Sequence, residues 1–342
     1  MKQINLISDT VTKPTPEMLD YMMKAEVGDD VFREDPSINT LESKAATLFG
    51  HEAALFCPSG TMTNQIALRV HTNPLDEVIC DHFSHIYQYE TGGYAYNSGL
   101  AIKLLEGING KITPAQIKSA INPSHDWLPN STLVVLENTC NKGGGTIYSQ
   151  DEMKNISKLC RDSGLKLHLD GARIFNALVE TGDTPSEVGQ LFDSISICLS
   201  KGLGAPVGSL LLGNSDFIAK ARRFRKVMGG GMRQAGYLAA AGIYALDHHV
   251  ERLVIDNNRA KMVGNVLKDL PFVASIRPVQ TNILIFDLTS DWIAQDFLDH
   301  LKGKGILAVP FGPRTIRFTF HLDLDDNDIN QVIEVLKKMA EE

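Results

Sequence analysis

The sequence predicts an α/β protein with a large domain, built on a mostly parallel sheet covered by helices, and a small C-terminal α+β domain. Three observations carry this prediction. The chain has 342 residues, more than one compact core usually holds. Between residues 53 and 212, short apolar runs alternate with amphipathic helical stretches. Many of these runs are apolar at consecutive positions, which is typical of parallel strands buried between two layers of helices.

Seven apolar runs are the expected strands of the large sheet. They are Ala53–Phe56, Val78–Asp81, Ala101–Leu105, Leu133–Leu136, Leu165–Asp170, Ile195–Leu199 and Val207–Leu212. Helical patterns stand between several of them, at Thr61–Val70, Gln150–Asp162 and Pro185–Leu191. Because ligands of such sheets bind beyond the carboxyl ends of the strands, the residues that follow these runs are the first candidates for a site.

The C-terminal part changes pattern. A long helical stretch covers Arg233–Leu267, with an expected break near Asp247–His249. After it we expect strands near Asn282–Asp287, Gly305–Val309 and Thr315–Phe320, and helices near Asp291–Lys302 and Asp325–Met339. These elements predict a boundary near residue 245, between a large domain (1–245) and a small one (246–342).

Composition excludes several classes of partner. The formal net charge is −8 and no basic run occurs, so nucleic acid and anionic membrane surfaces have no electrostatic support. No apolar stretch is long enough to cross a bilayer, and the N-terminal residues lack the pattern of a signal peptide. The five cysteines form no C-x-x-C pair, so neither a disulfide framework nor a structural zinc site is expected. These features favour a cytoplasmic protein.

The segment S-K-G-L-G-A-P-V-G-S, residues 200–209, carries the first candidate catalytic residue. Lys201 follows an apolar strand, in a turn of small residues. A desolvated lysine at a strand end can lose its proton and form a Schiff base with an aldehyde, and the glycines let the backbone approach a flat ring. An exposed lysine in a glycine-rich turn would have the same local sequence.

The segment K-L-H-L-D-G-A-R, residues 166–173, supplies a carboxylate for the same site. Asp170 ends a predicted strand, where it could hold a proton on the ring nitrogen of pyridoxal phosphate (PLP). The spacing to Lys201 leaves room for one helix and one strand, so both residues could face one cofactor. An aspartate that caps a helix is the alternative. We expect His168 to point away from Asp170, as a core histidine.

Two further segments also follow apolar runs. C-P-S-G-T-M-T-N-Q, residues 57–65, predicts an anion site in which Ser59, Gly60 and Thr61 bind a phosphate at a helix start; a plain capped helix is the alternative. In D-H-F-S-H-I-Y-Q-Y-E, residues 81–90, His85 could stack on the cofactor ring or transfer a proton. A surface or capping histidine is the alternative there.

Taken together, these segments resemble the low-specificity L-threonine aldolases, which are aspartate-aminotransferase-like (fold type I) PLP enzymes alongside the β-eliminating lyases. The resemblance extends over the whole chain. Its motifs are S-D-T-V-T (8–12), V-G-D-D-V-F (27–32), P-S-G-T-M-T-N (58–64), S-H-I-Y-Q-Y-E (84–90), L-E-N-T (136–139), H-L-D-G-A-R-I-F-N-A (168–177), S-K-G-L-G-A-P-V-G-S (200–209), G-G-G-M-R-Q-A-G (229–236) and F-H-L-D (320–323). It implies cleavage of L-threonine and L-allo-threonine to glycine and acetaldehyde, with PLP as the cofactor.

The resemblance also implies a role for each candidate residue. PLP attachment is expected at Lys201, while Asp170 is expected to contact the ring nitrogen and His85 the ring face. Arg173 is expected to contact the ring hydroxyl and the substrate carboxylate, and Arg317 and Ser8 the substrate carboxylate. The phosphate is expected to bind to Ser59, Gly60 and Thr61, and to Arg233 across a subunit interface. It further implies a homotetramer. Cys140 stands where family members often have histidine, and the segment 125–130 around His125 aligns poorly, so the preference between threonine and allo-threonine stays open.

Two other functions are compatible with the same motifs. One is a related PLP lyase that performs β-elimination, or an activity like that of serine hydroxymethyltransferase, because one PLP site serves many reactions. The other is a protein that binds PLP without catalysis; the presence of Lys201, Asp170 and Arg317 argues against it.

Overall fold

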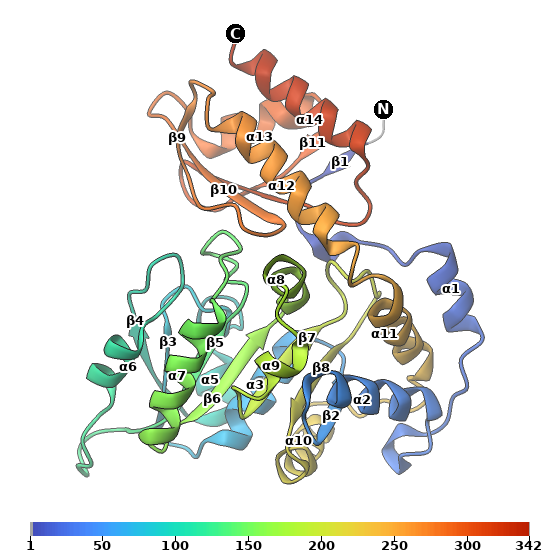
Figure 1. Cartoon of the computed structure of the whole chain (residues 1–342), viewed down its shortest axis with the longest axis vertical. Coiled ribbons are helices and arrows are strands. Elements are labelled where there is room, and N and C mark those ends of the chain that lie inside the picture. Colours follow the sequence, from blue (N-terminus) through green and yellow to red (C-terminus); the bar gives the residue numbers. More distant parts are fainter. Residues whose placement is uncertain (1–2, 342) are drawn as a thin grey trace.

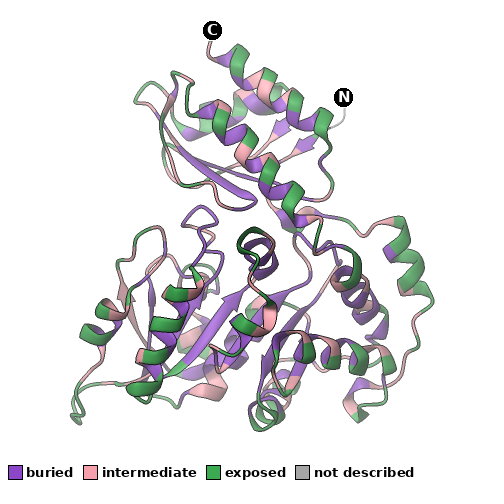
Figure 2. Cartoon of the chain, viewed as in Figure 1, coloured by how far each residue is buried: buried purple, intermediate pink, exposed green. Residues whose placement is uncertain are grey.

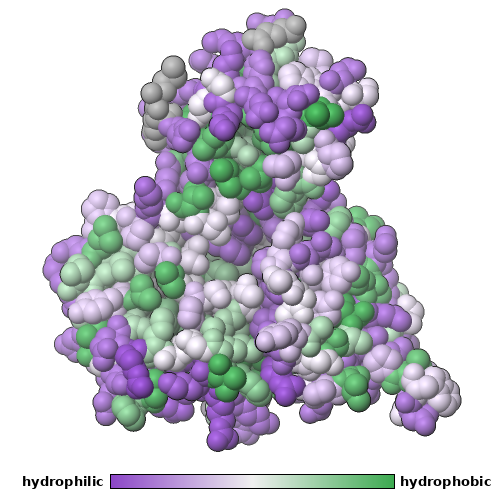
Figure 3. Space-filling view, turned by 180° about the vertical axis from the view of Figure 1, so that it is seen from behind, coloured by the Kyte–Doolittle hydropathy of each residue, from purple (hydrophilic) through white to green (hydrophobic). Residues whose placement is uncertain are grey.

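The computed structural model describes residues 3–341 and shows two lobes (Figure 1). The large lobe holds a seven-stranded sheet with helices on both faces, and the small lobe contains both the first and the last of the described elements. Most strands of both lobes are buried, while the covering helices expose their outer faces (Figure 2). Seen from behind, hydrophobic residues form only small groups, several of them near the waist between the lobes (Figure 3). Within residues 3–341 no helix has the length and apolar character that a membrane span requires.

The seven strands predicted for the large sheet are all present. They are β2 (Ala53–Cys57), β3 (Asp76–Asp81), β4 (Ala101–Leu105), β5 (Asn130–Glu137), β6 (Lys166–Gly171), β7 (Ser194–Cys198) and β8 (Ser209–Gly213), in the order β2-β8-β7-β6-β5-β3-β4. Only β8 runs antiparallel to its neighbours, β2 and β7. The carboxyl ends of β5, β6 and β7 therefore lie side by side at one edge of the sheet.

Alternate strand residues face different helices. Leu167 and Leu169 of β6 belong to the main hydrophobic core, with α2 (Pro36–Phe49) and α7 (Gln150–Asp162). The opposite face packs on α3 (Gly60–His71) and α10 (Ser215–Val227). The other helices of this lobe are η1 (Asp9–Val11), α1 (Pro16–Met23), η2 (Asp30–Phe32), α4 (His85–Gln88), α5 (Gly93–Ser98), α6 (Pro114–Ala120), α8 (Ile174–Thr181), α9 (Pro185–Gly189) and α11 (Gly236–His248).

The prediction for His168 was half right. The residue is fully buried, as a core histidine should be. It does not point away from Asp170, because residues two apart on a strand lie on the same face. Both side chains contact Asn64 of α3.

The small lobe joins the chain's N-terminal segment to its C-terminal part. Its four-stranded antiparallel sheet has the order β12 (Val309–Pro310), β13 (Thr315–Thr319), β10 (Ile283–Leu288), β9 (Val273–Ile276), and its helices are α12 (Leu253–Leu267), α13 (Ala294–Gly303) and α14 (Asp326–Met339). A separate pair, β1 (Ile4–Asn5) and β11 (Ile306–Leu307), is parallel. The strand expected at 305–309 is therefore two short strands in two sheets, a division set by partners far away in sequence.

The boundary at residue 245 stays a prediction. The helical stretch breaks between His248 and Leu253, next to the expected position. The hydrophobic core of the large lobe includes Leu253, and that of the small lobe begins at Ala260 on the same helix. The small core also takes in Ile4 from the N-terminal segment, which the predicted division assigned to the large domain.

Candidate active site

A cavity of about 140 Å³ opens where β5, β6 and β7 end. Its lining residues are Ser59, Gly60, Thr61, Asn64, His85, Glu137, Asn141, Asp170, Ala172, Arg173, Cys198, Ser200 and Lys201. Larger cavities, of up to about 580 Å³, are lined by none of the residues to which the sequence assigned a catalytic or binding role. Chemistry rather than volume therefore identifies the site, and it lies where ligands bind in sheets of this kind.

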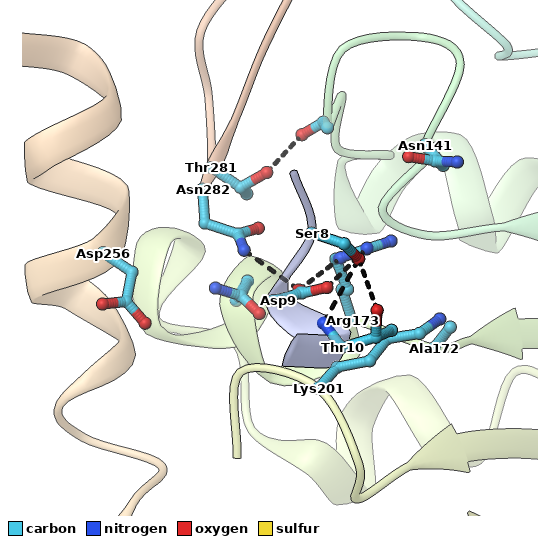
Figure 4. A network of polar contacts seen from close by, with 12 residues as sticks. Ser8, Asp9, Thr10, Asn141, Ala172, Arg173, Lys201, Asp256, Thr281 and Asn282 are labelled. Atoms are coloured by element: carbon cyan, nitrogen blue, oxygen red, sulfur yellow. Dashed lines mark hydrogen bonds and ion pairs between the residues drawn. The ribbon is translucent and has the colours of Figure 1, made fainter. Parts of the chain in front are cut away.

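Lys201 lies in the loop after β7, and its backbone is fixed at two points. Its carbonyl oxygen accepts hydrogen bonds from Thr12 Oγ1, at 3.0 Å, and from the backbone N–H of Gly204, at 2.8 Å. Figure 4 shows the lysine side chain beside Ser8 and Arg173. The loop thus presents a primary amine to the cavity from a fixed backbone position.

Asp170 enters the cavity from the end of β6 and is 3% exposed. Its Oδ2 accepts from Asn64 Nδ2 at 2.8 Å, and its Oδ1 accepts from the backbone N–H of Ala172 at 3.1 Å. Two N–H donors therefore fix the plane of this carboxylate and leave further lone pairs for a ligand. A buried, fixed carboxylate suits a ring N–H group.

His85 begins α4 and is held by two carboxylates. Its backbone N–H donates to Glu137 Oε2 at 2.8 Å, and its Nδ1 lies 2.9 Å from Glu90 Oε1. Glu90 also accepts from the side-chain amides of Asn64, at 2.9 Å, and Gln65, at 2.6 Å. Since Glu90 acts as an acceptor throughout, His85 Nδ1 is the donor, and Nε2 keeps its lone pair.

The electrostatics of this corner shift two pKa values upward. Burial acts to lower the pKa of His85, but the hydrogen bond to Glu90 and the charges of Asp170, Glu137 and Glu90 outweigh it and raise the pKa above 6.5. Burial, together with the nearby Asp170 carboxylate, raises the pKa of Glu137 to about 7. Two ionisable groups with raised pKa values in one cavity are typical of acid–base sites.

His85, Glu90 and Asp170 also lie close enough together to ligate a metal ion, with their ligand atoms within 4.8 Å of one another. Their hydrogen bonds account for this closeness, since Asn64 joins the two carboxylates and Glu90 holds the histidine. We therefore assign the cluster to acid–base chemistry.

The start of α3 forms an anion cradle. Ser59 is its N-cap, and its hydroxyl accepts from the backbone N–H of Met62 at 3.2 Å. The first N–H groups of a helix, here at Gly60 and Thr61, have no intrahelical partner and lie at the positive end of the helix dipole. Ser59 and Thr61 are exposed to the cavity mouth. This arrangement suits a phosphate.

Two arginines approach from opposite lobes. Arg317 of β13 donates to Asn141 Oδ1 and to the carbonyl of Ile7, each at 2.8 Å, while its buried Nε has no partner among the described residues. Burial, with the nearby charge of Arg173, lowers the pKa of Arg317 to about 10, so it stays charged at neutral pH.

Arg173, just before α8, is committed to Asp9. Its Nε and Nη2 donate to the two Asp9 oxygens at 2.7 Å each, and Asn282 donates to Asp9 at 3.1 Å. Figure 4 shows Asn282 and Arg173 reaching Asp9 from opposite sides. Although burial opposes it, the charge and hydrogen bonds of Arg173 hold the pKa of Asp9 well below its usual range. Only the remaining N–H groups of Arg173 can turn to a ligand.

Several expected residues lie outside the cavity. Ser8 and Arg317 do not line it, although Arg317 donates to Asn141, which does. Arg233 pairs with Asp29 at 2.8 Å, with its side chain 53% exposed, so its phosphate role stays a prediction that needs a second subunit. His125 is exposed and stacks on Trp127. Cys140 is buried beside the site without lining it.

Four buried polar residues that support the site had no role in the sequence-based predictions, although two of them, Asn64 and Glu137, line the cavity. Asp9, Asn64, Glu90 and Glu137 are all buried, and each holds a predicted site residue in place. All four belong to motifs already noted, namely residues 8–12, 58–64, 84–90 and 136–139. Glu137 directly follows the apolar run 133–136, which was an available signal; Asp9, Asn64 and Glu90 stand in polar segments that carried none.

The family model described as beta-eliminating lyase matches residues 5–291. The chain belongs to the beta-eliminating lyase family. Within it, the chain is similar to the low specificity L-threonine aldolase of Escherichia coli K12, with 40% identity over 96% of this chain and 97% of that protein. The chain is also similar to the low-specificity L-threonine aldolase 1 of Arabidopsis thaliana, with 36% identity over 99% of this chain and 96% of that protein.

Solved structures of other enzymes have the same fold as this chain. The threonine aldolase of Leishmania major has a TM-score of 0.85 at 24% identity, covering 98% of this chain and 99% of its own. The serine palmitoyltransferase of Sphingomonas wittichii has a TM-score of 0.78 at 15% identity, covering 99% and 87%. The aspartate-aminotransferase-like type I fold of PLP enzymes is thus confirmed.

Proposed function

We propose that this chain is a PLP-dependent aldolase that cleaves L-threonine and L-allo-threonine to glycine and acetaldehyde. The observation that carries the proposal is one cavity that combines an amine, Lys201, a fixed carboxylate, Asp170, a histidine with a free ring nitrogen, His85, and a helix N-terminus. The similarity to named low specificity L-threonine aldolases over nearly the whole chain supports the choice of reaction.

The residues present fit PLP. Lys201 would bind its aldehyde carbon, Asp170 its ring nitrogen, and Ser59, Gly60 and Thr61 its phosphate. The buried Arg317 Nε, which has no partner among the described residues, marks a place for an acceptor beside this cavity. When bound, PLP supplies an electron sink for the charge left at the substrate's α-carbon as a bond to that atom breaks.

The chain's own residues contribute orientation and proton transfer. Asp170, held by two donors, would keep a proton on the ring nitrogen of a bound PLP. Arg317 Nε and the Ser8 hydroxyl donate to the substrate carboxylate, with the free N–H groups of Arg173 as a further donor. This grip sets which bond to the α-carbon is aligned for cleavage.

His85 is the base in this proposal. Its Nδ1 is held by Glu90, so Nε2 can take the proton of the β-hydroxyl group as the bond between the α- and β-carbons breaks. The fixed imidazole then carries a positive charge that Glu90, Glu137 and Asp170 stabilise. The same nitrogen can return a proton.

We further propose that the enzyme is a cytoplasmic homotetramer that serves threonine catabolism and glycine formation. The exposed position of Arg233 supports a multi-subunit site, because this side chain pairs with Asp29 and does not line the cavity of its own chain. Light scattering on the purified protein gives the subunit number.

The deciding experiment incubates purified, PLP-loaded protein with L-threonine and assays acetaldehyde and glycine. Lys201→Ala should abolish turnover and the visible absorption band that borohydride removes from the wild type. Lys158→Ala, at an exposed lysine paired with Asp162, is the matched control and should behave as wild type. Turnover by Lys201→Ala at the normal rate would refute the mechanism.

Beta-elimination is the second candidate, because the matching family model carries that description. It would give pyruvate and ammonia from serine, or 2-oxobutyrate and ammonia from threonine. Formation of these products in place of acetaldehyde would move the chain to that reaction.

A further inference from the structure

The mechanism above makes no use of a fully buried histidine one layer behind the cavity. His168 lies on β6, two residues before Asp170, and is 0% exposed. Its Nε2 lies 3.2 Å from Asn64 Oδ1, and its Nδ1 lies 2.7 Å from Ser194 Oγ on β7. Ser194 Oγ in turn lies 2.7 Å from Nε2 of His71, at the end of α3. A chain of four side chains thus runs from one end of α3 to the cavity.

The direction of every hydrogen bond in this row of side chains follows from the contacts of Asn64, the member that lines the cavity. Asn64 Nδ2 approaches carboxylate oxygens of both Asp170 and Glu90, at 2.8 and 2.9 Å. Only the amide nitrogen can donate to both, so Asn64 Oδ1 is the atom that faces His168. An amide oxygen accepts only, so His168 Nε2 carries the proton.

The donors and acceptors among His168, Ser194 and His71, farther from the cavity, are assigned in the same way. Burial lowers the pKa of His168 to about 4, so the ring is neutral and its Nδ1 has no proton. Ser194 therefore donates to His168 Nδ1, and Ser194 Oγ accepts from His71 Nε2. Burial lowers the pKa of His71 to about 3, so this ring is neutral as well. All donors point toward the two carboxylates.

We infer that His168 is a positioning residue for the cofactor site, because its Nε2–H holds the Asn64 amide in the one orientation that bridges Asp170 and Glu90. Asp170 is the proposed partner of the ring nitrogen, and Glu90 holds His85. The Asn64 amide thus fixes the position of Asp170, the proposed partner of the ring nitrogen, relative to Glu90, which holds the proposed base His85. Without the His168 donor, Asn64 Oδ1 is a buried acceptor with no partner, and the amide is free to tilt.

The inference rests on the proposed function for its kinetic readout, but cofactor affinity tests it independently. His168→Leu removes the donor at similar volume, and His168→Gln keeps an N–H group at the same reach. We expect His168→Leu to raise the Kd for PLP and to lower kcat, each about tenfold, as for other partners that orient ligating groups. KM for threonine should change little, because Arg317 and Ser8 hold the substrate carboxylate from the other side. His168→Gln should recover most of both losses.

A double variant separates positioning from general damage. If His168 acts through Asn64, then Asn64→Ala with His168→Leu should bind PLP no more weakly than Asn64→Ala alone. His51→Leu, which removes a half-buried histidine at the far end of α2, is the control and should leave PLP affinity and kcat unchanged. Equal PLP affinity and kcat in wild type and His168→Leu, or losses that add fully in the double variant, would overturn the inference.

A measurement on the unaltered holoenzyme covers the case in which the leucine variant fails to fold. Neutron diffraction shows directly which nitrogen of a buried imidazole carries deuterium. We expect density on Nε2 of His168 and none on Nδ1. Deuterium on Nδ1, or on both nitrogens, would end the proposal whatever reaction the enzyme performs. If the wild type binds PLP but does not cleave threonine, the proposed function fails while the affinity and neutron results still decide this inference.

Discussion

The replacement of Asp9 by asparagine tests whether the pair formed with Arg173 holds the active site together. Asp9 is 0% exposed and accepts two short hydrogen bonds from Arg173 and a third from Asn282. The variant keeps the shape but removes the charge that balances a buried guanidinium. Breaking a buried ion pair by removing one partner typically costs about 3–5 kcal/mol. We therefore expect the free energy of unfolding to fall by about that amount.

The assay is urea unfolding of the cofactor-free protein, followed by circular dichroism at pH 7. Asp20→Asn is the control, because Asp20 pairs with Lys24 on an exposed helix surface and such pairs contribute about 0.5 kcal/mol or less. A loss in Asp9→Asn below about 1 kcal/mol, similar to the control, would refute the reasoning. It would mean that solvent or a neighbour compensates the arginine once the carboxylate is gone.

The dependence on pH checks the same claim. A carboxyl group whose pKa is lowered by folding stabilises the native state fully above its unfolded value, here 3.8, and loses this contribution as the pH falls toward the folded value. The difference between wild type and Asp9→Asn should therefore be constant from pH 7 to pH 5. It should begin to shrink below about pH 4.

Three further changes probe the proposed roles. Asp170→Asn should lower kcat about 100-fold or more with PLP still bound, because an amide does not keep a proton on the ring nitrogen; wild-type kinetics would remove that role. Arg317→Lys should raise KM for threonine about tenfold to 100-fold, since lysine lacks the planar fork; an unchanged KM would place the substrate carboxylate elsewhere. With His85 as the base, kcat/KM should fall on the acid side of a pKa above 6.5, and His85→Asn should abolish this limb of the profile; its persistence in the variant would assign it to another group, such as Glu137.

The strands and the residues at their ends were predictable because both depend on local pattern. An apolar run bounded by small or polar residues fixes a buried strand, and parallel strands bring their carboxyl ends to one edge. Lys201, Asp170, His85 and the turn at residues 59–61 therefore met in one cavity as expected. The segments that follow buried strands needed no knowledge of long-range packing.

The supporting residues behind these groups were decided by tertiary structure. Asp9 lies far from Arg173 in the sequence, and their pairing depends on how the N-terminal segment passes from the small lobe to the large one (Figure 1). Arg317 comes from a second sheet, and Arg233 stays with Asp29 at the surface.

The sequence by itself determined the strands of the sheet, the edge at which the cavity lies and the candidate side chains found there, because strand period and strand-end position are local properties of the backbone. Only the tertiary structure decided which buried acceptor each of those side chains uses. A buried polar group must find a partner wherever packing brings one, and that partner can come from any part of the chain. The bridge from His168 through Asn64 to Asp170 joins two elements whose contact no local pattern specifies.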